Sequence, residues 1–278
     1  MVTKEKEAFF NEIVSGLTDL LPLPTTVMAI IQISKNPNSN LQDLVKLLDK
    51  DQSMVTRILK LANSAQYGFA KQVKTINHAV VCLGFKTIRN MALTVSVSPM
   101  FQQSVDSYLL EKEELFKHSN AVAVGTRLIA KRQEYTNPDE AYVMGLLHDV
   151  GKVVLDQHAK EKFVDVINLV KKGNINFIEA EEQILGFNHG EIGSKVAEKW
   201  NLSNELVETI RFHHHPEQAG ENNKSVHMVH VANYLVEMMG IGIGYDGLNY
   251  GFHEKSMDIL GLNDVDLESL IVGIMNEL

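Results

Sequence analysis

The sequence predicts an all-α protein. Apolar residues recur at helical spacing, as in Val55, Ile58, Leu59 and Ala62, which follow the i, i+3, i+4, i+7 pattern. No run alternates apolar and polar residues as a half-buried strand requires. There are only six prolines in 278 residues, while Leu, Lys, Glu, Ala and Met, which favour helices, are abundant. We therefore expect a bundle of helices with almost no strand.

Capping residues place several helices in the first hundred residues. Asn40 and Asp51 are favourable N-cap residues, and each precedes an apolar pattern of helical period. Thr75 is expected to start a further helix, which Gly84 ends because glycine interrupts helices. The helices expected here cover roughly residues 41–48, 52–62, 76–83 and 85–95.

The second half of the sequence is also helical in pattern. A long helix is expected from about Asp106 to Lys131. The tetrapeptide that starts at Asn137 is a strong start signal, because Asn caps, Pro fits the first turn and the acids favour the positive end of the helix dipole. The glycine-rich stretch Ile241–Gly247 follows no expected strand, so it is a loop rather than a dinucleotide fingerprint. Further helices are expected near residues 161–172, 176–185, 189–199, 203–213, 226–239 and 264–276.

Charge is distributed unevenly along the chain. Residues 1–105 contain 11 Lys and Arg against 7 Asp and Glu, whereas residues 106–278 contain 15 against 28. Together with the loop-like composition around residues 98–104, this contrast predicts an N-terminal helical subdomain over residues 1–103 and a second helical domain over residues 104–278. One continuous helical body with a chance charge gradient is the alternative.

Composition disfavours several classes of protein. The net charge of −9 and the pI near 5.7 disfavour general binding to nucleic acids or anionic membranes. The one cysteine, Cys82, rules out an intramolecular disulfide and a cysteine-built zinc site, and we expect it in the core. Met1–Glu12 is too charged for a signal peptide, and no apolar stretch approaches the roughly 18 residues of a membrane span. A soluble, cytoplasmic protein is expected.

The eleven histidines carry the chemistry that this sequence offers. His148 and Asp149 are adjacent at the expected end of a helix, where the last turn unwinds and both side chains can be aimed at one point. Imidazole and carboxylate are ligands of Zn, Fe, Mn and Ni, and the two oxygens of a carboxylate can bridge two metal ions. Lys152 lies one helical turn further on, where it could meet a phosphate oxygen.

The residues around this doublet resemble a known signature. The segment Met-Gly-Leu-Leu-His-Asp-Val-Gly-Lys, from Met144 to Lys152, is similar to the HD superfamily of metal-dependent phosphohydrolases. The resemblance implies an HD-domain, phosphodiesterase-like helical bundle, in which an upstream histidine, matched by His118, and an Asp from a late helix complete the site. Asn233 occupies that last position here. Its carbonyl oxygen can bind a metal but brings no charge, so one metal site should be weaker.

Four segments of the N-terminal half extend the resemblance. With them the chain is identified as a member of the HDOD family, the HD-related output domain of bacterial signalling proteins, over roughly Leu21 to Pro216. Membership implies a bacterial signal-transduction output module with a protein partner. The segments are Leu21-Pro-Leu-Pro-Thr, Asp49-Lys-Asp-Gln-Ser-Met, Leu59-Lys-Leu-Ala-Asn-Ser-Ala-Gln-Tyr-Gly and Ile76-Asn-His-Ala-Val-Val-Cys-Leu-Gly.

Three further histidines match a related group. His189, His213 and His214 correspond to the additional histidines of the HD-GYP proteins, which resemble two-metal cyclic dinucleotide phosphodiesterases. The Gly-Tyr-Pro extension of that group is missing here, because Pro216 and Glu217 lead straight into Gln-Ala-Gly. That departure argues against hydrolysis of a cyclic dinucleotide.

The combined resemblance implies a metal centre built around Asp149. It would hold one or two divalent transition-metal ions (Fe, Mn, Zn or Ni), and Asp149 and Lys152 would take the catalytic roles. The metal ligands implied are His118, His148 and Asn233 on one side of Asp149, and His189, His213 and His214 on the other.

Each assignment has a structural alternative. The doublet could be a buried hydrogen-bonded pair, and His118 could be a core histidine. For the three histidines shared with the HD-GYP group, the structural and the metal-binding interpretations carry about equal weight. If Asn233 lies away from the pocket, His227 and His230 are the next candidates for the last ligand.

Two functions from different classes follow. In the first, the protein is a signalling output module that docks a partner protein, and its HD-like pocket is a relic or a ligand sensor. In the second, it is a metal-dependent phosphohydrolase or phosphodiesterase acting on a nucleotide or cyclic (di)nucleotide. We expect a metal, a signalling protein partner and a nucleotide or phosphate ligand, and we expect neither direct nucleic-acid binding nor membrane association.

Overall fold

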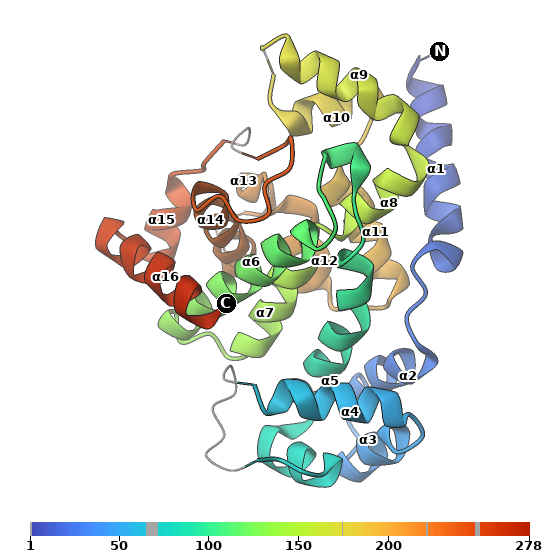
Figure 1. Ribbon diagram of the computed structural model, residues 1–278, viewed down its shortest axis with the longest axis vertical. Helices are drawn as coiled ribbons and strands as arrows, with labels where there is room; N and C mark the ends of the chain where they lie inside the picture. The colour runs from blue at the N-terminus through green and yellow to red at the C-terminus, as the bar shows by residue number, and fades with distance from the viewer. Residues whose placement is uncertain (1, 65–71, 174, 221, 248–250) are drawn as a thin grey trace. The chain divides into compact units, whose positions relative to one another are not determined.

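The computed structural model describes residues 2–64, 72–173, 175–220, 222–247 and 251–278 (Figure 1). Within these residues the fold is all-α and contains no strand, apart from an isolated bridge between Val105 and Leu110. The predicted fold class is therefore confirmed. One end of the segment Leu59–Gly68, on which the family resemblance partly rests, lies outside the described residues.

The chain divides into two compact units. Unit 1 comprises residues 1–22 and 100–276, and unit 2 comprises residues 23–99. The charge pattern places a boundary at residue 103, close to the point where the chain enters unit 1 for the second time. The first 22 residues, which the charge pattern groups with the N-terminal half, belong to unit 1.

The caps expected in unit 2 are present. The side chain of Asn40 accepts hydrogen bonds from the backbone of Gln42 and Asp43 and completes a capping box, and Asp51 accepts one from Met54 N. These bonds satisfy amide groups that the first turn of a helix leaves without partners. The helices are α2 (Thr25–Ser34), α3 (Leu41–Leu48), α4 (Gln52–Ala62) and α5 (Ile76–Phe101), the last of which ends in unit 1.

Helix α5 consists of two helical parts that meet at Gly84. The φ of 79° and ψ of 174° at Gly84 interrupt the helix there, as the sequence predicts, but the second part runs on to Phe101. By length and composition α5 could cross a membrane, so the expectation that no segment approaches that length is wrong. Half of its apolar window is buried inside the fold, and one such helix is weak evidence for a membrane span.

Cys82 lies on the exposed face of the first part of α5. Its side chain is exposed, so the prediction of a core position is wrong. The buried residues of this part of the helix are Ile76, Ala79 and Val80, and positions 81 and 82 fall on the opposite face.

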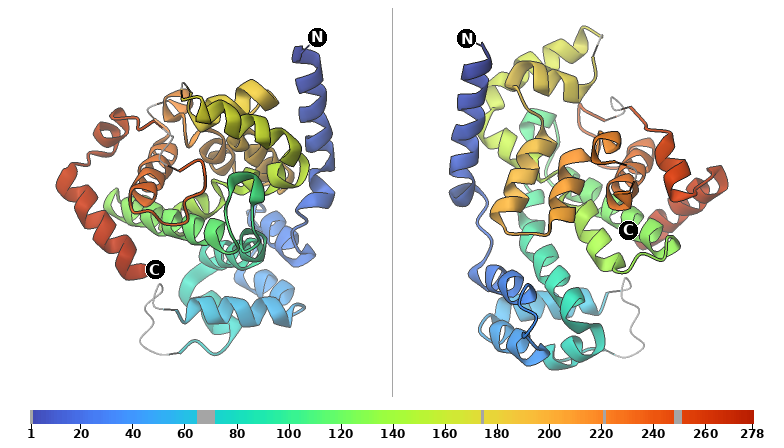
Figure 2. Two further views of the ribbon diagram at one scale, coloured as in Figure 1. Left: turned by 45° about the horizontal axis from the view of Figure 1, so that its top comes forward. Right: turned by 180° about the vertical axis from the view of Figure 1, so that it is seen from behind.

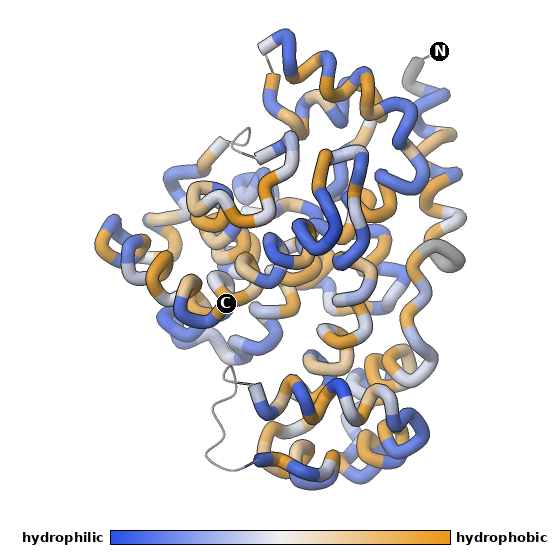
Figure 3. The backbone as a smooth tube through the Cα atoms, in the orientation of Figure 1, coloured by the Kyte–Doolittle hydropathy of each residue, from blue (hydrophilic) through white to orange (hydrophobic). Residues whose placement is uncertain are grey.

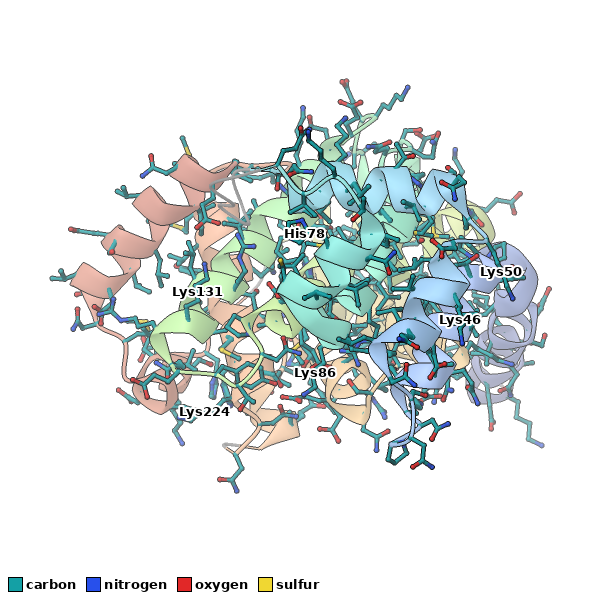
Figure 4. The ribbon with its side chains drawn as sticks, turned by 90° about the horizontal axis from the view of Figure 1, so that it is seen from below. Lys46, Lys50, His78, Lys86, Lys131 and Lys224 are labelled. Atoms are coloured by element: carbon teal, nitrogen blue, oxygen red, sulfur yellow. The ribbon has the colours of Figure 1, made fainter. Side chains whose placement is uncertain are left out.

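Unit 2 is basic. Residues 23–99 contain nine Lys and Arg against three Asp and Glu. Lys46 of α3, Lys50 in the turn after α3, and His78 and Lys86 of α5 are exposed, and the side-chain view labels all four (Figure 4). Within the described part of the chain, these three lysines form no ion pair. We call these four residues the basic face of unit 2.

Unit 1 contains the remaining helices, and six of the expected ones are present within two residues at each end. These six are α9 (Lys160–Lys171), α10 (Phe177–Leu185), α11 (His189–Lys199), α12 (Asn204–Phe212), α14 (Lys224–Met238) and α16 (Asp264–Glu277). Figure 3 shows α9 alternating between hydrophobic and hydrophilic segments, as expected of a helix with one buried face. The others are α1 (Val2–Leu20), α6 (Glu114–Arg132), α7 (Pro138–Leu147), α8 (Val150–His158), α13 (Pro216–Ala219) and α15 (Lys255–Leu260).

The long helix expected from residue 106 begins later than predicted. A short 3-10 helix covers Asp106–Tyr108, and α6 starts only at Glu114. Between them Leu109 and Glu113 have φ values of 54° and 71°, which lie in the left-handed region and break the helix. Neither position is a glycine or proline, so the sequence gives no local signal for the break. The helical spacing of apolar residues therefore placed the start of the helix too early.

Two glycines allow helices of unit 1 to approach closely. A Cβ atom at Gly145 would lie 2.7 Å from Ala123 Cα, so α7 rests directly on the backbone of α6. At Gly151 a Cβ atom would lie 1.9 Å from the carbonyl oxygen of His189, so the start of α8 lies directly against the first residue of α11. These approaches bring the ends of several helices to one point in unit 1.

The first helix completes unit 1. α1 lies along α11 and α8 (Figures 1 and 2), and the rings of Phe9 and Phe10 lie 5.8 and 5.1 Å from that of Phe187. Trp200 donates a hydrogen bond of 2.9 Å to the carbonyl oxygen of Leu21. Beyond α1, residues Leu21 and Pro22 line a cavity of about 300 Å³ together with Met100.

Candidate metal centre

The seven side chains implied as metal ligands meet in the interior of unit 1. Helix ends supply most of them, because backbone at a helix end can turn a side chain inward. Asp149, His148, His189 and His213 have no exposed surface, and His118 and Asn233 are 5% and 4% exposed. The positions are His118 on α6, His148 and Asp149 between α7 and α8, His189 at the start of α11, His213 and His214 after α12, and Asn233 on α14.

Asp149 is the centre of the cluster. Its Oδ2 atom lies 3.2 Å from His148 Nε2 and 3.7 Å from His118 Nε2. Its Oδ1 atom lies 3.3 Å from His189 Nε2 and 3.7 Å from His213 Nε2. Each carboxylate oxygen therefore faces a different set of imidazoles. This is the arrangement in which one carboxylate can bridge two ions.

Two groups of side chains could each hold a metal ion. In each group the ligand atoms lie within 4.8 Å of one another. Asp149 belongs to both groups, which agrees with the division expected from the sequence. The groups are His118, His148 and Asp149, and Asp149, His189, His213 and His214.

The backbone fixes which nitrogen of each ring faces the centre. Nδ1 of His148 lies 2.7 Å from the carbonyl oxygen of Gly145, and Nδ1 of His213 lies 2.8 Å from that of Ile210. A neutral imidazole that donates from Nδ1 presents a lone pair at Nε2, the form that binds metals. In the described structure, both Nε2 atoms are buried and make no hydrogen bond. A metal ion would satisfy them, so the site fits a transition metal.

Glu181 is a member of the site that the sequence reasoning missed. Its Oε2 atom accepts hydrogen bonds from Nδ1 and from the backbone N of His189, both at 2.9 Å. The hydroxyl of Tyr108 donates to its other oxygen. Burial lowers the pKa of His189, but the charge of Glu181 and the hydrogen bonds of Asp149 and Glu181 outweigh it and raise that pKa to about 9. Glu181 thereby fixes the orientation of His189.

A sequence signal for Glu181 exists. In α10 the buried residues Phe177, Ile178, Ala180 and Leu185 define the inner face, and Glu181 lies on that face. A carboxylate on an otherwise apolar face requires a buried partner. The pattern therefore marks Glu181 as a candidate without identifying His189 as its partner.

Asn233 lies where the resemblance places the last ligand. Its Oδ1 atom is 2.9 Å from His118 Nε2, and its Nδ2 donates to Glu237 at 2.9 Å. Glu237, one turn later on α14, was also missed. Its burial, then the nearby charge of Asp246, raises its pKa to about 8.

Lys152 is a buried cation between two carboxylates. Its Nζ atom lies 2.8 Å from Asp149 Oδ2 and 2.5 Å from Asp246 Oδ2. Burial lowers the pKa of Lys152, but the charges of Asp149 and Asp246 outweigh it and raise the pKa. For Asp149, burial raises the pKa, whereas the neighbouring imidazole of His148 and the charge of Lys152 prevail and hold it well below its usual range. Lys152 and Asp149 are therefore both charged at neutral pH.

His227 and His230, the alternative candidates for the last ligand, lie beside the cluster. Nδ1 of His230 lies 2.8 Å from the carbonyl oxygen of His213, and its Nε2 accepts a hydrogen bond from the backbone N of His253. Both ring nitrogens of His230 are thus occupied, which leaves no lone pair for a metal. His227 Nδ1 lies 2.8 Å from the hydroxyl of Ser256. Neither histidine belongs to the two metal-binding groups of the described residues.

The sequence matches the HDOD domain family over residues 20–216. An uncharacterized protein of Treponema pallidum is 28% identical over 229 residues, which are 82% of this chain and 44% of that protein. The chain therefore spans less than half the length of that relative.

Solved structures share the fold. A crystal structure of an HDOD domain protein from Geobacter sulfurreducens has a TM-score of 0.74 and 28% identity, and the match covers 98% of this chain and 89% of that one. A candidate phosphohydrolase from Shewanella amazonensis has a TM-score of 0.71 and 24% identity, with 95% and 93% covered. A candidate signal-transduction protein from Marinobacter aquaeolei has a TM-score of 0.71 and 23% identity, with 99% and 65% covered.

Proposed function

The chain belongs to the HDOD domain family, and on that premise we propose that it is a signal-transduction output module whose HD-like site in unit 1 binds one or two divalent transition-metal ions. One observation carries the proposal. The two oxygens of Asp149 face separate sets of buried imidazoles, at 3.2 Å from His148 and 3.3 Å from His189. The Nε2 lone pairs of His148 and His213 are buried beside this carboxylate without a hydrogen bond, which is costly unless a metal ion binds them.

The residues that would hold the ions follow from the geometry. His118, His148 and Asp149 would hold one, with Asn233 contributing an uncharged oxygen. Asp149, His189, His213 and His214 would hold the other. When bound, such ions supply Lewis acidity and a water of lowered pKa. Glu181 orients His189, and the backbone carbonyls orient His148 and His213.

A metal-dependent phosphohydrolase acting on a nucleotide or cyclic (di)nucleotide is the second candidate. Lys152 favours it, because this buried ammonium group lies 2.8 Å from Asp149, where it could neutralise an oxygen of a phosphoryl group. Asn233 weighs against it, because the ligand shell lacks one negative charge. A signalling output module need not turn over a substrate. The missing negative charge at Asn233 is therefore compatible with that function.

The protein partner that an output module requires is also a proposal. The basic face of unit 2 supports a partner that presents carboxylates, because Lys46, Lys50 and Lys86 lack ion pairs within the described structure. Val81, 73% exposed between His78 and Lys86 in the sequence, adds an apolar contact. The double variant Lys46→Glu, Lys86→Glu should bind such a partner more weakly than wild type does. The variant Lys160→Glu on unit 1 should bind the partner as tightly as wild type does. Equal effects of the two charge reversals would contradict this docking face.

Elemental analysis of the purified protein tests the metal site. The His148→Ala, Asp149→Ala double variant should lose the transition metal, because an imidazole and the bridging carboxylate are both removed. The matched control is His158→Ala, Asp165→Ala, which removes the same two residue types from exposed positions. Equal metal content in wild type and the site variant would refute the proposal. Assays of the metal-loaded protein with p-nitrophenyl phosphate and bis(p-nitrophenyl) phosphate then separate the two functions, since only the hydrolase turns either over.

A further inference from the structure

The glycine-rich segment 240–247 closes over the metal centre. It follows α14 and reads Gly-Ile-Gly-Ile-Gly-Tyr-Asp-Gly. The carbonyl oxygen of Ile241 lies 3.2 Å from His118 Nδ1, and Tyr245 N donates a hydrogen bond of 2.8 Å to the carbonyl oxygen of Tyr108. The sequence reasoning correctly treated the segment as a loop but assigned it no role.

Two glycines make this closeness possible. A Cβ atom at Gly242 would lie 2.3 Å from the carbonyl oxygen of Glu114, and Gly242 has a φ of 58°. A Cβ atom at Gly244 would lie 2.5 Å from the carbonyl oxygen of Tyr108. Larger residues at these positions would hold the segment away from the backbone of Glu114 and Tyr108, so the glycines specify the closed position.

Almost no space remains beneath the segment. The cavity lined by His118, Asp149, Lys152, Glu237 and the segment itself measures about 10 Å³. That is at or below the volume that one water molecule requires. A phosphoryl group therefore cannot reach Asp149 or Lys152 while the segment lies in this position.

Asp246 occupies the place that an anionic ligand of Lys152 would take. Its side chain is 5% exposed, and its Oδ2 atom lies 2.5 Å from Lys152 Nζ. On the other side of the same ammonium group lies Asp149, at 2.8 Å. A carboxylate oxygen and a phosphoryl oxygen are similar charged acceptors, and both pair with ammonium groups. A phosphate-type ligand must displace Asp246 before it can pair with Lys152.

We propose that residues 240–247 form an autoinhibitory lid, in which Asp246 acts as an internal substitute for an oxyanion of the phosphate class. The lid opens when such an oxyanion displaces Asp246 from Lys152. Gly240, which has a φ of 74° and would gain no Cβ contact closer than 3.9 Å, provides a hinge at its start. The inference deepens the proposed function, because it takes the centre around Asp149 as the ligand site.

Two variants open the lid in different ways. Asp246→Asn keeps the size of the side chain but removes the charge that holds Lys152. Gly242→Ala leaves Asp246 intact but adds a methyl group where the closed position has no room. The matched controls are Asp258→Asn and Gly251→Ala, an exposed aspartate and a glycine whose Cβ would meet nothing within 4 Å.

Hydrogen exchange measured on metal-free protein tests the lid. We expect the amides of 240–247 to exchange at least about tenfold faster in both variants than in wild type and the controls. Unchanged exchange in both variants would overturn the lid. Because this measurement involves no metal, it stands even if the proposed metal site fails.

Titration of the purified protein with inorganic phosphate, followed by calorimetry, tests the ligand class. Both variants should bind phosphate about tenfold or more tightly than wild type, because the internal competitor is weakened. Faster exchange without tighter phosphate binding would overturn the assignment of Asp246 as an oxyanion substitute.

Discussion

The side-chain oxygen of Asn233 lies 2.9 Å from His118 Nε2, and the carbonyl oxygen of Ile241 lies 3.2 Å from the other ring nitrogen. Both ring nitrogens of His118 thus face oxygen acceptors. Burial lowers the pKa of His118 to about 4, so at neutral pH the ring carries one hydrogen and can donate to only one acceptor. The other nitrogen presents a lone pair to an oxygen. A metal ion bound by both His118 Nε2 and Asn233 Oδ1 would replace this repulsion with coordination.

Asn233→Asp is expected to strengthen metal binding on the His118 side of Asp149. The substitution adds the negative charge that the ligand shell lacks, and affinity for a divalent cation rises with ligand charge. Calorimetric titration of metal-free protein with Mn²⁺ should give an affinity about tenfold higher for one site. Asn222→Asp, at an exposed position, is the control. Identical isotherms for wild type and Asn233→Asp would show that Asn233 is not a ligand.

Glu181→Gln is expected to weaken the other side of the centre. The amide keeps the size of the side chain but no longer holds His189 with a charge, and loss of such a partner typically costs about 10–100-fold in metal affinity. The pKa of His189 in metal-free protein should fall from about 9, as measured by NMR titration. Glu161→Gln, on the exposed face of α9, should change neither quantity. A retained pKa near 9 would refute the role of Glu181.

The metal-free protein is expected to lose stability as pH rises from about 7.5 to 9, above the range in which the buried histidines of lowered pKa bind protons on unfolding. Glu237 has a folded-state pKa of about 8, above its usual value of 4.5, so between these values the folded state binds more protons than the unfolded state. His189, with a pKa raised from 6.5 to about 9, acts in the same direction. Where the folded state binds more protons, the free energy of unfolding falls with rising pH.

Glu237→Gln isolates the first of these two contributions. The variant cannot ionise at this position, so relative to wild type its stability should improve by up to a few kcal/mol between pH 5 and pH 9. Urea unfolding of metal-free protein at both values measures the difference. Glu268→Gln, on an exposed part of α16, provides the baseline. A stability difference independent of pH would show that Glu237 is ionised throughout.

Gly151→Ala is expected to disrupt the centre through the backbone. The added methyl group would lie 1.9 Å from the carbonyl oxygen of His189 and 2.8 Å from Gly193 N, and neither backbone atom can rotate away. We expect a loss of about 1–3 kcal/mol in the free energy of unfolding, because the helices must separate. Metal content should fall as His189 moves from Asp149. Gly251→Ala should leave the melting temperature and metal content unchanged.

Local signals explain what the sequence revealed of the fold. Capping residues such as Asn40 and Asp51 act within a few positions of the chain, so the helices that they start could be located closely. The break before α6 could not, because Leu109 and Glu113 adopt left-handed backbone although neither residue type favours it. Helices α1 and α8 were missed because the first is highly charged and the second directly follows the His148-Asp149 doublet.

Similar limits apply to the candidate site. The seven side chains implied as ligands could be named because their residue types and spacing match a family signature. Glu181, Glu237 and Asp246 carry no such signature, and their roles depend on which helices pack together. The distance from Glu181 to His189 is eight residues, a spacing that does not place two side chains together on one helix. Only the turn between α10 and α11 brings them into contact.

The cavity shared by Pro22 and Met100 identifies unit 2 as an insertion in unit 1. The chain leaves unit 1 at residue 22 and re-enters it at residue 100, and both residues line the same space. A short glycine-serine bridge could therefore replace residues 23–99 and leave one continuous chain that contains the candidate metal centre. A fragment cut at residue 104 would instead lack α1, and the aromatic surfaces of Phe187 and Trp200 would meet water. Deleting residues 23–99 and joining the two flanking ends, rather than truncating the chain, is the way to isolate unit 1 with the candidate metal centre intact.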